Sequence, residues 1–291
     1  MRYEGIIIRP PSEAQSLILQ VTIGCSHNRC TFCPTYKGRR FRIRTLEEIQ
    51  EDVREASRWA KGVRRIFLCD GDPLVIPQKR LVPIMDLLCE SFPNLERIGI
   101  YANARSIRNK TVTELDELRK RKLGIVYLGV ESGDDEVLRR VRKGTDRDRL
   151  LEAGLKVKEA GIILSVTVLL GIGGVEGSTR HALETASLLS KMDPHYVGAL
   201  TLMVVPGTPL YEEMRRGDFR LPDTFQLIEE LGMMIANSNF TNCFFTSNHA
   251  SNYLPLKARL PQQKEEALML IKKVLSTRDK RFLRPEFMRA L

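Results

Sequence analysis

Short continuous runs of apolar residues alternate with helically spaced apolar residues along most of this chain. The continuous runs cover residues 16–23, 65–69, 97–101, 125–130, 162–170 and 196–205. Runs of this length predict strands, and their lack of polar alternation predicts burial on both faces of a sheet. The segments between them place apolar residues three and four positions apart, which predicts helices with one buried face. Parallel strands need such crossovers, so the order predicts a parallel sheet.

The helices of this alternation are expected at residues 45–60, 78–89, 113–121, 135–142, 145–160 and 178–192. The first begins with a sequence typical of a capping box, in which Thr45 and Glu48 each accept a backbone hydrogen bond from the other's residue. Six strand–helix units are fewer than the eight of a closed TIM barrel. The predicted fold class is therefore α/β, a partial (β/α)6 TIM-like barrel with a C-terminal extension.

Three segments are expected from this pattern: an N-terminal segment at 1–15, the partial barrel at 16–210, and an extension at 211–291 that closes the barrel. No further strand–helix unit is expected after Pro209. The extension should contain helices near 210–216, 223–236 and 261–275, and a loosely ordered basic tail at 278–289.

The charge and the termini add little to this interpretation. Lys and Arg number 46 and Asp and Glu number 36, which gives a net charge of +10 that is spread along the chain. This favours a solvated basic exterior, with nucleic acid, a phosphorylated substrate or an anionic surface as alternatives. No apolar run reaches the roughly 18–20 residues of a membrane span, and the first ten residues do not resemble a secretory signal. A cytoplasmic location without membrane attachment is expected.

Three of the six cysteines lie close together, in the pattern C-x4-C-x2-C of Cys25, Cys30 and Cys33. A tight cluster of this kind indicates metal binding rather than a disulfide framework. Three thiolates around a [4Fe–4S] cluster would leave one iron open to chelate a ligand. The alternative is a zinc site completed by His27 or a distant residue. The position after the first strand, where barrel enzymes place their chemistry, favours the iron–sulfur cluster.

In this loop the chain resembles the radical S-adenosylmethionine (SAM) superfamily. Its usual motif is C-x3-C-x2-C with an aromatic residue before the last cysteine, a position that Phe32 occupies here; one extra residue separates the first two cysteines. The resemblance extends over about residues 16–210. It implies a [4Fe–4S] cluster and SAM as cofactors, an electron donor such as flavodoxin or ferredoxin, and cleavage of SAM to a 5′-deoxyadenosyl radical.

The second predicted strand ends in Asp70-Gly71-Asp72-Pro73. This resembles the family's Gly-Gly-Glu-Pro turn, which binds the amino group of SAM, with Asp70 in place of a glycine and Asp72 in place of the glutamate. The resemblance implies that Gly71 and Asp72 contact SAM. The alternative is an ordinary tight turn.

The fourth strand ends in Gly129-Val130-Glu131-Ser132-Gly133. This resembles the Gly-x-Glu-Ser segment of one branch of the superfamily. That branch contains the Elongator catalytic subunit, the methylthiotransferases and the oxygen-independent coproporphyrinogen oxidases. The resemblance implies that Glu131 and Ser132 face SAM or substrate; alternatively, Ser132 or Asp134 caps the next helix. Asn103 after the third strand is a further candidate. The family packs adenine near the glycine-rich turn that begins at Gly171, where glycines permit close approach.

Two other segments could hold the substrate. Residues 246–253 are dense in hydrogen-bonding side chains, and His249 and Tyr253 could donate a proton or hydrogen atom. Alternatively, they satisfy local turns. The basic run at 39–44 could bind phosphate, carboxylate or RNA with Phe41 as a stacking surface, although its alternation favours a strand at the edge of solvent.

The remaining cysteines, Cys69, Cys89 and Cys243, form no second motif and are expected to be small core residues. This argues against methylthiotransfer and for hydrogen abstraction, rearrangement, oxidation or methyl transfer. The sequence therefore predicts a radical SAM enzyme that abstracts hydrogen from a small-molecule substrate. The alternatives are a radical SAM enzyme that modifies tRNA and a non-catalytic zinc or iron–sulfur protein.

Overall fold

The computed structural model describes residues 1–290, which form two compact units. The first unit contains residues 1–28, 35–128 and 152–164. The second contains residues 29–34, 129–151 and the chain from 165 onward. Among the described residues, no helix combines the length and the apolarity that a membrane crossing requires.

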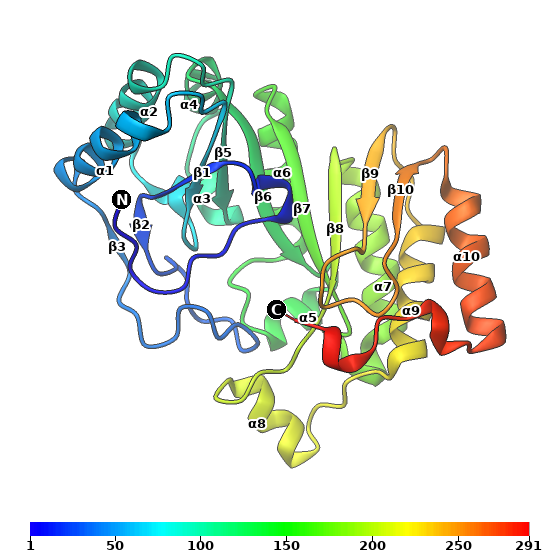
Figure 1. Ribbon diagram of the computed structural model, residues 1–291. Coiled ribbons are helices and arrows are strands. Elements are labelled where there is room, and N and C mark those ends of the chain that lie inside the picture. Colours follow the sequence, from blue (N-terminus) through cyan, green and yellow to red (C-terminus); the bar gives the residue numbers. More distant parts are fainter. Residues whose placement is uncertain (291) are drawn as a thin grey trace. The chain divides into compact units, whose positions relative to one another are not determined.

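The first unit is built on parallel strands in the order β1-β4-β5-β6 (Figure 1). These strands are β1 (Leu17–Gln20), β4 (Arg65–Cys69), β5 (Arg97–Ala102) and β6 (Leu123–Glu131), the last three residues of which belong to the second unit. The two-residue strands β2 (Thr22–Ile23) and β3 (Arg42–Ile43) form a separate antiparallel pair. The edge strand expected in the basic run at 39–44 is therefore present as β3.

Helices connect these strands and cover their apolar side chains. They are α1 (Leu46–Trp59), α2 (Gln78–Ser91), α3 (Ala104–Arg108) and α4 (Val112–Lys120), with the 3-10 turns η1 (Pro11–Glu13) and η2 (Pro73–Val75). Helix α1 packs on α2, and α2 packs on α4 (Figure 1). The capping box of α1 is confirmed, because the side chains of Thr45 and Glu48 both accept the expected backbone hydrogen bonds. The core contains Phe67, Tyr101 and Tyr127, whose rings meet edge to face.

The second unit is built on β7 (Ile163–Leu170), β8 (Tyr196–Thr201), β9 (Cys243–Thr246) and β10 (Lys257–Leu260) in that order, with the first two residues of β7 in the first unit. Strands β7, β8 and β9 are parallel, and β10 is antiparallel to β9. The helices are α5 (Asp135–Arg140), α6 (Arg147–Glu159), α7 (Gly174–Met192), α8 (Pro209–Arg216), α9 (Thr224–Ala236) and α10 (Lys264–Thr277), with α6 crossing between the units' residue ranges. Helix α9 packs on both α7 and α10 (Figure 1).

The predicted α/β class and its six parallel strand–helix units are confirmed. After Pro209 the structure adds β9, a seventh strand parallel to β8 that the sequence did not predict; β9 continues into the antiparallel strand β10 rather than into a further strand–helix unit. The expectation of a loose tail is wrong. Its 3-10 turns η3 (Lys280–Phe282) and η4 (Glu286–Met288) are held by side chains of Arg284 and Arg289, which bond to carbonyl groups at residues 249–252.

Candidate functional site

The beginning of the cysteine loop is fixed to the end of β4 within the first unit. The backbone N–H of Gly24 donates to Asp70 Oδ2 at 2.6 Å, and the N–H of Gly71 donates to the carbonyl of Gly24 at 3.1 Å. A Cβ added to Gly71 would lie 2.5 Å from the Cβ of Cys25, closer than two carbons can approach. Glycine at position 71 is therefore what allows the Asp-Gly-Asp-Pro turn to pack directly against Cys25.

Asp70 stands where the family's turn has a glycine, and the structure explains the substitution. Its φ is +88°, a left-handed conformation that costs energy for any residue with a Cβ. The hydrogen bond from Gly24 N–H to its carboxylate offsets part of that cost. Burial raises the pKa of Asp70, and the Gly24 hydrogen bond opposes that increase. The side chain thus ties the turn to the cysteine loop, which a glycine could not do.

The end of the cysteine loop is fixed within the second unit. The N–H of Thr31 donates to the carbonyl of Val141 at 3.0 Å, and the carbonyl of Thr31 accepts from Leu210 N–H at 3.1 Å. Phe32 packs against a buried apolar cluster that includes Leu169. Thr31 and Phe32 therefore anchor the segment that carries Cys30 and Cys33, whose side chains are themselves partly exposed.

Asp72 is a fully buried carboxylate at the centre of a polar network. Its Oδ2 accepts from Ser26 Oγ at 2.6 Å and from Asn103 Nδ2 at 2.7 Å. Its Oδ1 accepts from Ser106 Oγ at 2.7 Å and from Asn103 N–H at 3.3 Å. Asn103 in turn caps α3, because its Oδ1 accepts from Ser106 N–H. Asp72 therefore joins the cysteine loop to the ends of β4 and β5, and its hydrogen bonds offset the cost of burying a polar group.

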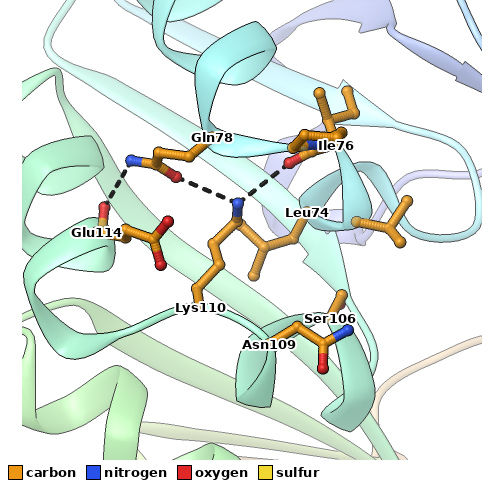
Figure 2. Close-up of a pocket in the computed structure, with 9 residues that line it drawn as sticks. Leu74, Ile76, Gln78, Ser106, Asn109, Lys110 and Glu114 are labelled. Atoms are coloured by element: carbon orange, nitrogen blue, oxygen red, sulfur yellow. Dashed lines mark hydrogen bonds between the residues drawn. The ribbon is translucent and has the colours of Figure 1, made fainter.

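A cavity of about 260 Å³ lies next to this network and is lined by η2, α3 and the start of α4 (Figure 2). The ammonium group of Lys110 points toward two acceptors, the carbonyl of Ile76 at 3.1 Å and Oε1 of Gln78 at 3.2 Å (Figure 2). Burial lowers the pKa of Lys110, while the charges of Glu114 and Asp72 oppose the shift. Lys110 thus braces the 3-10 turn that follows Asp72.

Glu131 ends β6 in a strained conformation. Its φ is +63°, which is rare for a residue with a side chain. Its Oε1 accepts from Lys143 Nζ at 2.8 Å, and both side chains are largely buried. The carboxylate lies over Gly129, where a Cβ would come within 2.5 Å of Oε1. The Gly-x-Glu spacing therefore lets the glutamate fold back along its own strand toward Lys143.

Ser132 is fully buried and its hydroxyl is held from two sides. Ser132 Oγ lies 2.8 Å from Nδ1 of His181 on α7 and accepts from Asp134 N–H at 3.0 Å. Asp134 is the N-cap of α5, as one of the two alternatives predicted. These contacts give Ser132 a role in shaping the end of β6, and its predicted contact with SAM stays a prediction.

Gly171 ends β7 and is glycine for two reasons. Its φ is +83°, and a Cβ would lie 2.7 Å from the side chain of Leu227 on α9. Its N–H donates to Glu230 Oε1 at 2.7 Å. Glu230 is fully buried on α9, and burial raises its pKa to about 7. The turn after β7 is therefore held by a carboxylate that the sequence analysis did not select.

The predicted catalytic side chains, His249 and Tyr253, both have partners nearby. His249 contacts Ser251, and Tyr253 contacts the C-terminal segment. Nδ1 of His249 lies 2.9 Å from Ser251 Oγ, and burial lowers the pKa of His249. The hydroxyl of Tyr253 donates to Glu286 at 2.6 Å, and the guanidinium of Arg289 lies over its ring. These contacts match the structural alternative for residues 246–253, and the catalytic role stays a prediction.

Of the remaining cysteines, Cys69 and Cys243 lie in the cores as predicted, whereas Cys89 does not. Cys69 on β4 and Cys243 on β9 are fully buried, and Cys89 on α2 is half-buried. Burial raises the pKa of all three thiols, that of Cys243 to about 12, which disfavours the thiolate that a metal needs. Within residues 1–290, no three or more His, Cys, Asp or Glu side chains are gathered closely enough to hold a single metal ion.

The donor set of Cys25, Cys30 and Cys33 suits a cubane better than a zinc ion. Each cysteine of a cubane binds a different iron, so the three sulfur atoms need not converge on one point as they must around zinc. All three side chains are partly exposed, unlike Cys69 and Cys243. Backbone hydrogen bonds of Gly24 hold the beginning of the loop, and backbone hydrogen bonds of Thr31 hold its end.

Several residues of these networks escaped the sequence analysis. Ser26 and Ser106 lack a motif, and Lys143 lies twelve positions from its partner Glu131. Glu230 carried a usable signal, because it stands between Leu227 and Met234 on the apolar face of α9. An acid at a core position of an amphipathic helix indicates a specific partner.

Comparison with known proteins places these observations in a family. The family model described as the radical SAM superfamily matches residues 19–189, more than half of the chain. A protein of Methanocaldococcus jannaschii that is named as a methylthiotransferase is 30% identical over 146 residues, 48% of this chain and 31% of that protein. The tRNA-2-methylthio-N(6)-dimethylallyladenosine synthase of Clostridium botulinum (strain Loch Maree) is 26% identical over 79% of this chain and 52% of its own length.

Among solved structures, the coproporphyrinogen III oxidase of Escherichia coli, titled a radical SAM enzyme, has the same fold. The TM-score is 0.56 at 18% identity, over 76% of this chain and 51% of the oxidase. The matches therefore agree with the branch predicted from the Gly-x-Glu-Ser segment. This chain spans between a third and about half of these three proteins.

Proposed function

Because this chain belongs to the radical SAM superfamily, we propose that it holds a [4Fe–4S] cluster through Cys25, Cys30 and Cys33 and cleaves SAM reductively. The single observation that carries the proposal is this three-cysteine loop, which the family match covers. Members of the superfamily use a [4Fe–4S] cluster with SAM. A cluster bound by three thiolates supplies an open iron for SAM and the electron that breaks its sulfonium C–S bond, which yields a 5′-deoxyadenosyl radical.

The chain's own residues would bind and orient SAM at the strand ends. In the first unit, Gly71 presents its backbone beside Cys25, and Asp72 holds Asn103 and Ser26 in place. In the second unit, Glu131 offers a carboxylate, and the backbone of the turn that begins at Gly171 would lie near the adenine. Phe32 fixes the loop by packing into the apolar cluster, so we assign it to positioning rather than to contact.

We further propose hydrogen abstraction from a small-molecule substrate, with the electron supplied by a flavodoxin or ferredoxin. The burial and raised thiol pKa of Cys69 and Cys243 support this choice over sulfur insertion, which would need a second set of thiolate ligands. His249 and Tyr253 stay candidates for a hydrogen or proton donor.

A second candidate is a radical SAM enzyme that modifies tRNA. The C. botulinum relative is named for such a modification, and the net charge of +10 suits a polyanion. This candidate predicts binding to tRNA that weakens steeply as salt increases. A lack of measurable tRNA binding at low salt would exclude it.

The proposal is tested by anaerobic reconstitution followed by SAM cleavage. We expect about four iron and four sulfide per chain and formation of 5′-deoxyadenosine under reduction. Cys30→Ala should abolish both, whereas Cys89→Ala, outside the loop on α2, should retain both. A Cys30→Ala protein that still cleaves SAM, or a wild-type protein that purifies colourless with zinc, would overturn the proposal.

A further inference from the structure

The second unit contains two buried ionisable side chains that have no role in the proposed function. His181 on α7 and Glu230 on α9 are both fully buried, and Nε2 of His181 lies 3.4 Å from Oε1 of Glu230. Burial lowers the pKa of His181 to about 4, which leaves its imidazole neutral, and raises the pKa of Glu230 to about 7. An apolar pair of equal volume would avoid these costs.

Two side chains of α7, His181 and Thr185, hold the turn after β6. His181 Nδ1 contacts Ser132 Oγ at 2.8 Å. One helical turn later, Thr185 Oγ1 accepts from Gly133 N–H at 2.8 Å and lies 3.3 Å from the same imidazole nitrogen. Residues four apart share a helix face, so the two side chains together bind consecutive residues of the turn.

Helix α9 holds the turn after β7 in the same way. Glu230 Oε1 accepts from Gly171 N–H at 2.7 Å, and Oε2 accepts from the hydroxyl of Ser178 on α7. His181 and Glu230 therefore lie side by side in the interior of the second unit without a hydrogen bond between them, and each holds one of the two turns, His181 the turn after β6 and Glu230 the turn after β7. Both turns carry residues that we propose bind SAM.

The strain at Glu131 shows what this connection accomplishes. A left-handed φ of +63° in a glutamate persists only where the surroundings impose it. Ser132, the next residue, is gripped by His181, and the Glu131 carboxylate is gripped by Lys143. Release of the Ser132–Gly133 turn would let the backbone at Glu131 relax and would move its carboxylate.

We infer that His181, Thr185 and Glu230 are positioning residues for SAM: they act through Ser132, Gly133 and Gly171 to hold the two strand ends in the binding geometry. The inference rests on the proposed function, because it takes SAM as the ligand of these turns. It assigns a role to helices that no motif marks.

The test uses the full chain with its cluster reconstituted anaerobically and measures the Kd for SAM by equilibrium dialysis. Thr185→Val keeps the shape of the side chain but removes the acceptor for Gly133 N–H, and should raise the Kd about tenfold. Thr185→Ser keeps the hydroxyl and should bind within about twofold of wild type. Glu230→Gln should weaken SAM binding severalfold. The two carboxylate oxygens of Glu230 accept one hydrogen bond each, from Gly171 and Ser178, and an amide has only one oxygen to accept with.

Two further readouts separate positioning from a merely structural role. Each variant should stay folded at the assay temperature with an iron content near the wild-type value, and the change that SAM causes in the electron paramagnetic resonance spectrum of the reduced cluster should diminish in Thr185→Val. Ser190→Ala removes a different α7 hydroxyl, which bonds to Ala186 and Asn239, and should behave as wild type.

Equal SAM affinity in wild type, Thr185→Val and Glu230→Gln, all with intact clusters, would overturn the inference and leave the proposed function standing. Loss of affinity in Thr185→Ser or Ser190→Ala as large as in Thr185→Val would also overturn it. A wild-type protein that holds a cluster but binds no SAM would instead refute the proposed function. Should Thr185→Val lose its cluster or fold, the spectrum and Kd of Glu230→Gln decide.

Discussion

The strand ends of the two units are held by different means. In the first unit the hub is Asp72, which stands in the strand-end turn itself and gathers Ser26, Asn103 and Ser106. In the second unit the strand-end turns bond to the supporting helices α7 and α9 through the hydroxyl of Ser132 and the backbone N–H groups of Gly133 and Gly171. There the hub is the pair His181–Glu230, which lies on the helices behind the turns.

This difference separates two ways of stiffening a binding turn. A carboxylate inside the turn binds its neighbours directly, and its removal takes an acceptor from several donors at once. Side chains on the supporting helices reach a ligand only through the turn residues that they hold. Their loss should therefore change the shape of the turn more than the stability of the unit. The following experiments test that contrast, beginning with the largest expected effect.

Removal of the first hub should be the most damaging. Asp72→Ala should lower the free energy of unfolding by about 3–5 kcal/mol, because the four hydrogen bonds that the buried carboxylate accepts from Ser26, Asn103 and Ser106 are lost together. Urea denaturation measures the change. The control is Asp86→Ala, a half-exposed partner of Arg121, which should cost less than about 1 kcal/mol. Equal losses in the two variants would contradict the role of Asp72 as a hub.

Two glycine substitutions should distinguish the units by what fails. Gly71→Ala places a Cβ 2.5 Å from that of Cys25, and Gly133→Ala places one 2.4 Å from the carbonyl oxygen of Glu184 on α7. Each should cost about 2–3 kcal/mol through overpacking. Gly71→Ala should also reduce the iron bound per chain, whereas Gly133→Ala should leave it nearly unchanged.

The control for both is Gly62→Ala, where an added Cβ meets no atom within 4 Å. It should leave both stability and iron content as in wild type. If Gly71→Ala assembles a full cluster, the packing of this glycine against Cys25 has no bearing on the site.

Glu230 should make the stability of the second unit depend on pH. Its pKa is raised to about 7 in the folded chain from about 4.5 in the unfolded chain, so its contribution is complete below about pH 4.5 and is lost as pH rises through 7. Glu230→Gln cannot titrate. The free energy of unfolding of wild type relative to Glu230→Gln should therefore fall by roughly 2 kcal/mol between pH 5 and pH 8.

His181 has a lowered pKa and acts in the opposite sense, since its contribution is present above about pH 6.5 and is lost as pH falls through about 4. It titrates in both proteins, so the difference between them isolates Glu230. If the stability difference between wild type and Glu230→Gln did not change with pH, burial would not raise the pKa of Glu230, and the prediction would fail.

The smallest effect should follow loss of the Glu131–Lys143 pair. Lys143→Met keeps the length of the side chain but leaves the Glu131 carboxylate without this partner, and should cost about 1–2 kcal/mol because both groups are largely buried. Lys120→Met, which breaks an exposed pair with Asp116, should cost less than about 0.5 kcal/mol. Chemical denaturation of the two variants side by side would reveal whether burial makes this difference.

Most of the fold could be predicted from the sequence because the six parallel strands are continuous apolar runs. Strand β9 was missed because Cys243–Thr246 is short and follows a polar segment, and its strand conformation depends on pairing with β8. Helix α7 begins at Gly174 rather than Ser178, since a glycine-rich turn gave no propensity signal for its first residues.

The candidate site could be predicted only where its residues stand in the strand-end turns. Gly71 and Asp72 were selected because the turn after the second predicted strand resembles the family's, and Asn103 because it lies just beyond the third strand. His181 and Glu230 lie 49 and 59 positions from the residues they hold, and distances of that kind are set by how helices pack on strands. No motif in the sequence marks His181, and the structure shows that it supports the turn after β6.

The most direct test of the central claim is pulsed electron–nuclear resonance on the reduced, anaerobically reconstituted chain with SAM that carries ¹⁵N in its amino group or ¹⁷O in its carboxylate. The account predicts magnetic coupling of both labels to the cluster, since one iron has no protein ligand. Absence of any coupling from bound SAM, or a fourth protein ligand that persists at that iron, would contradict it.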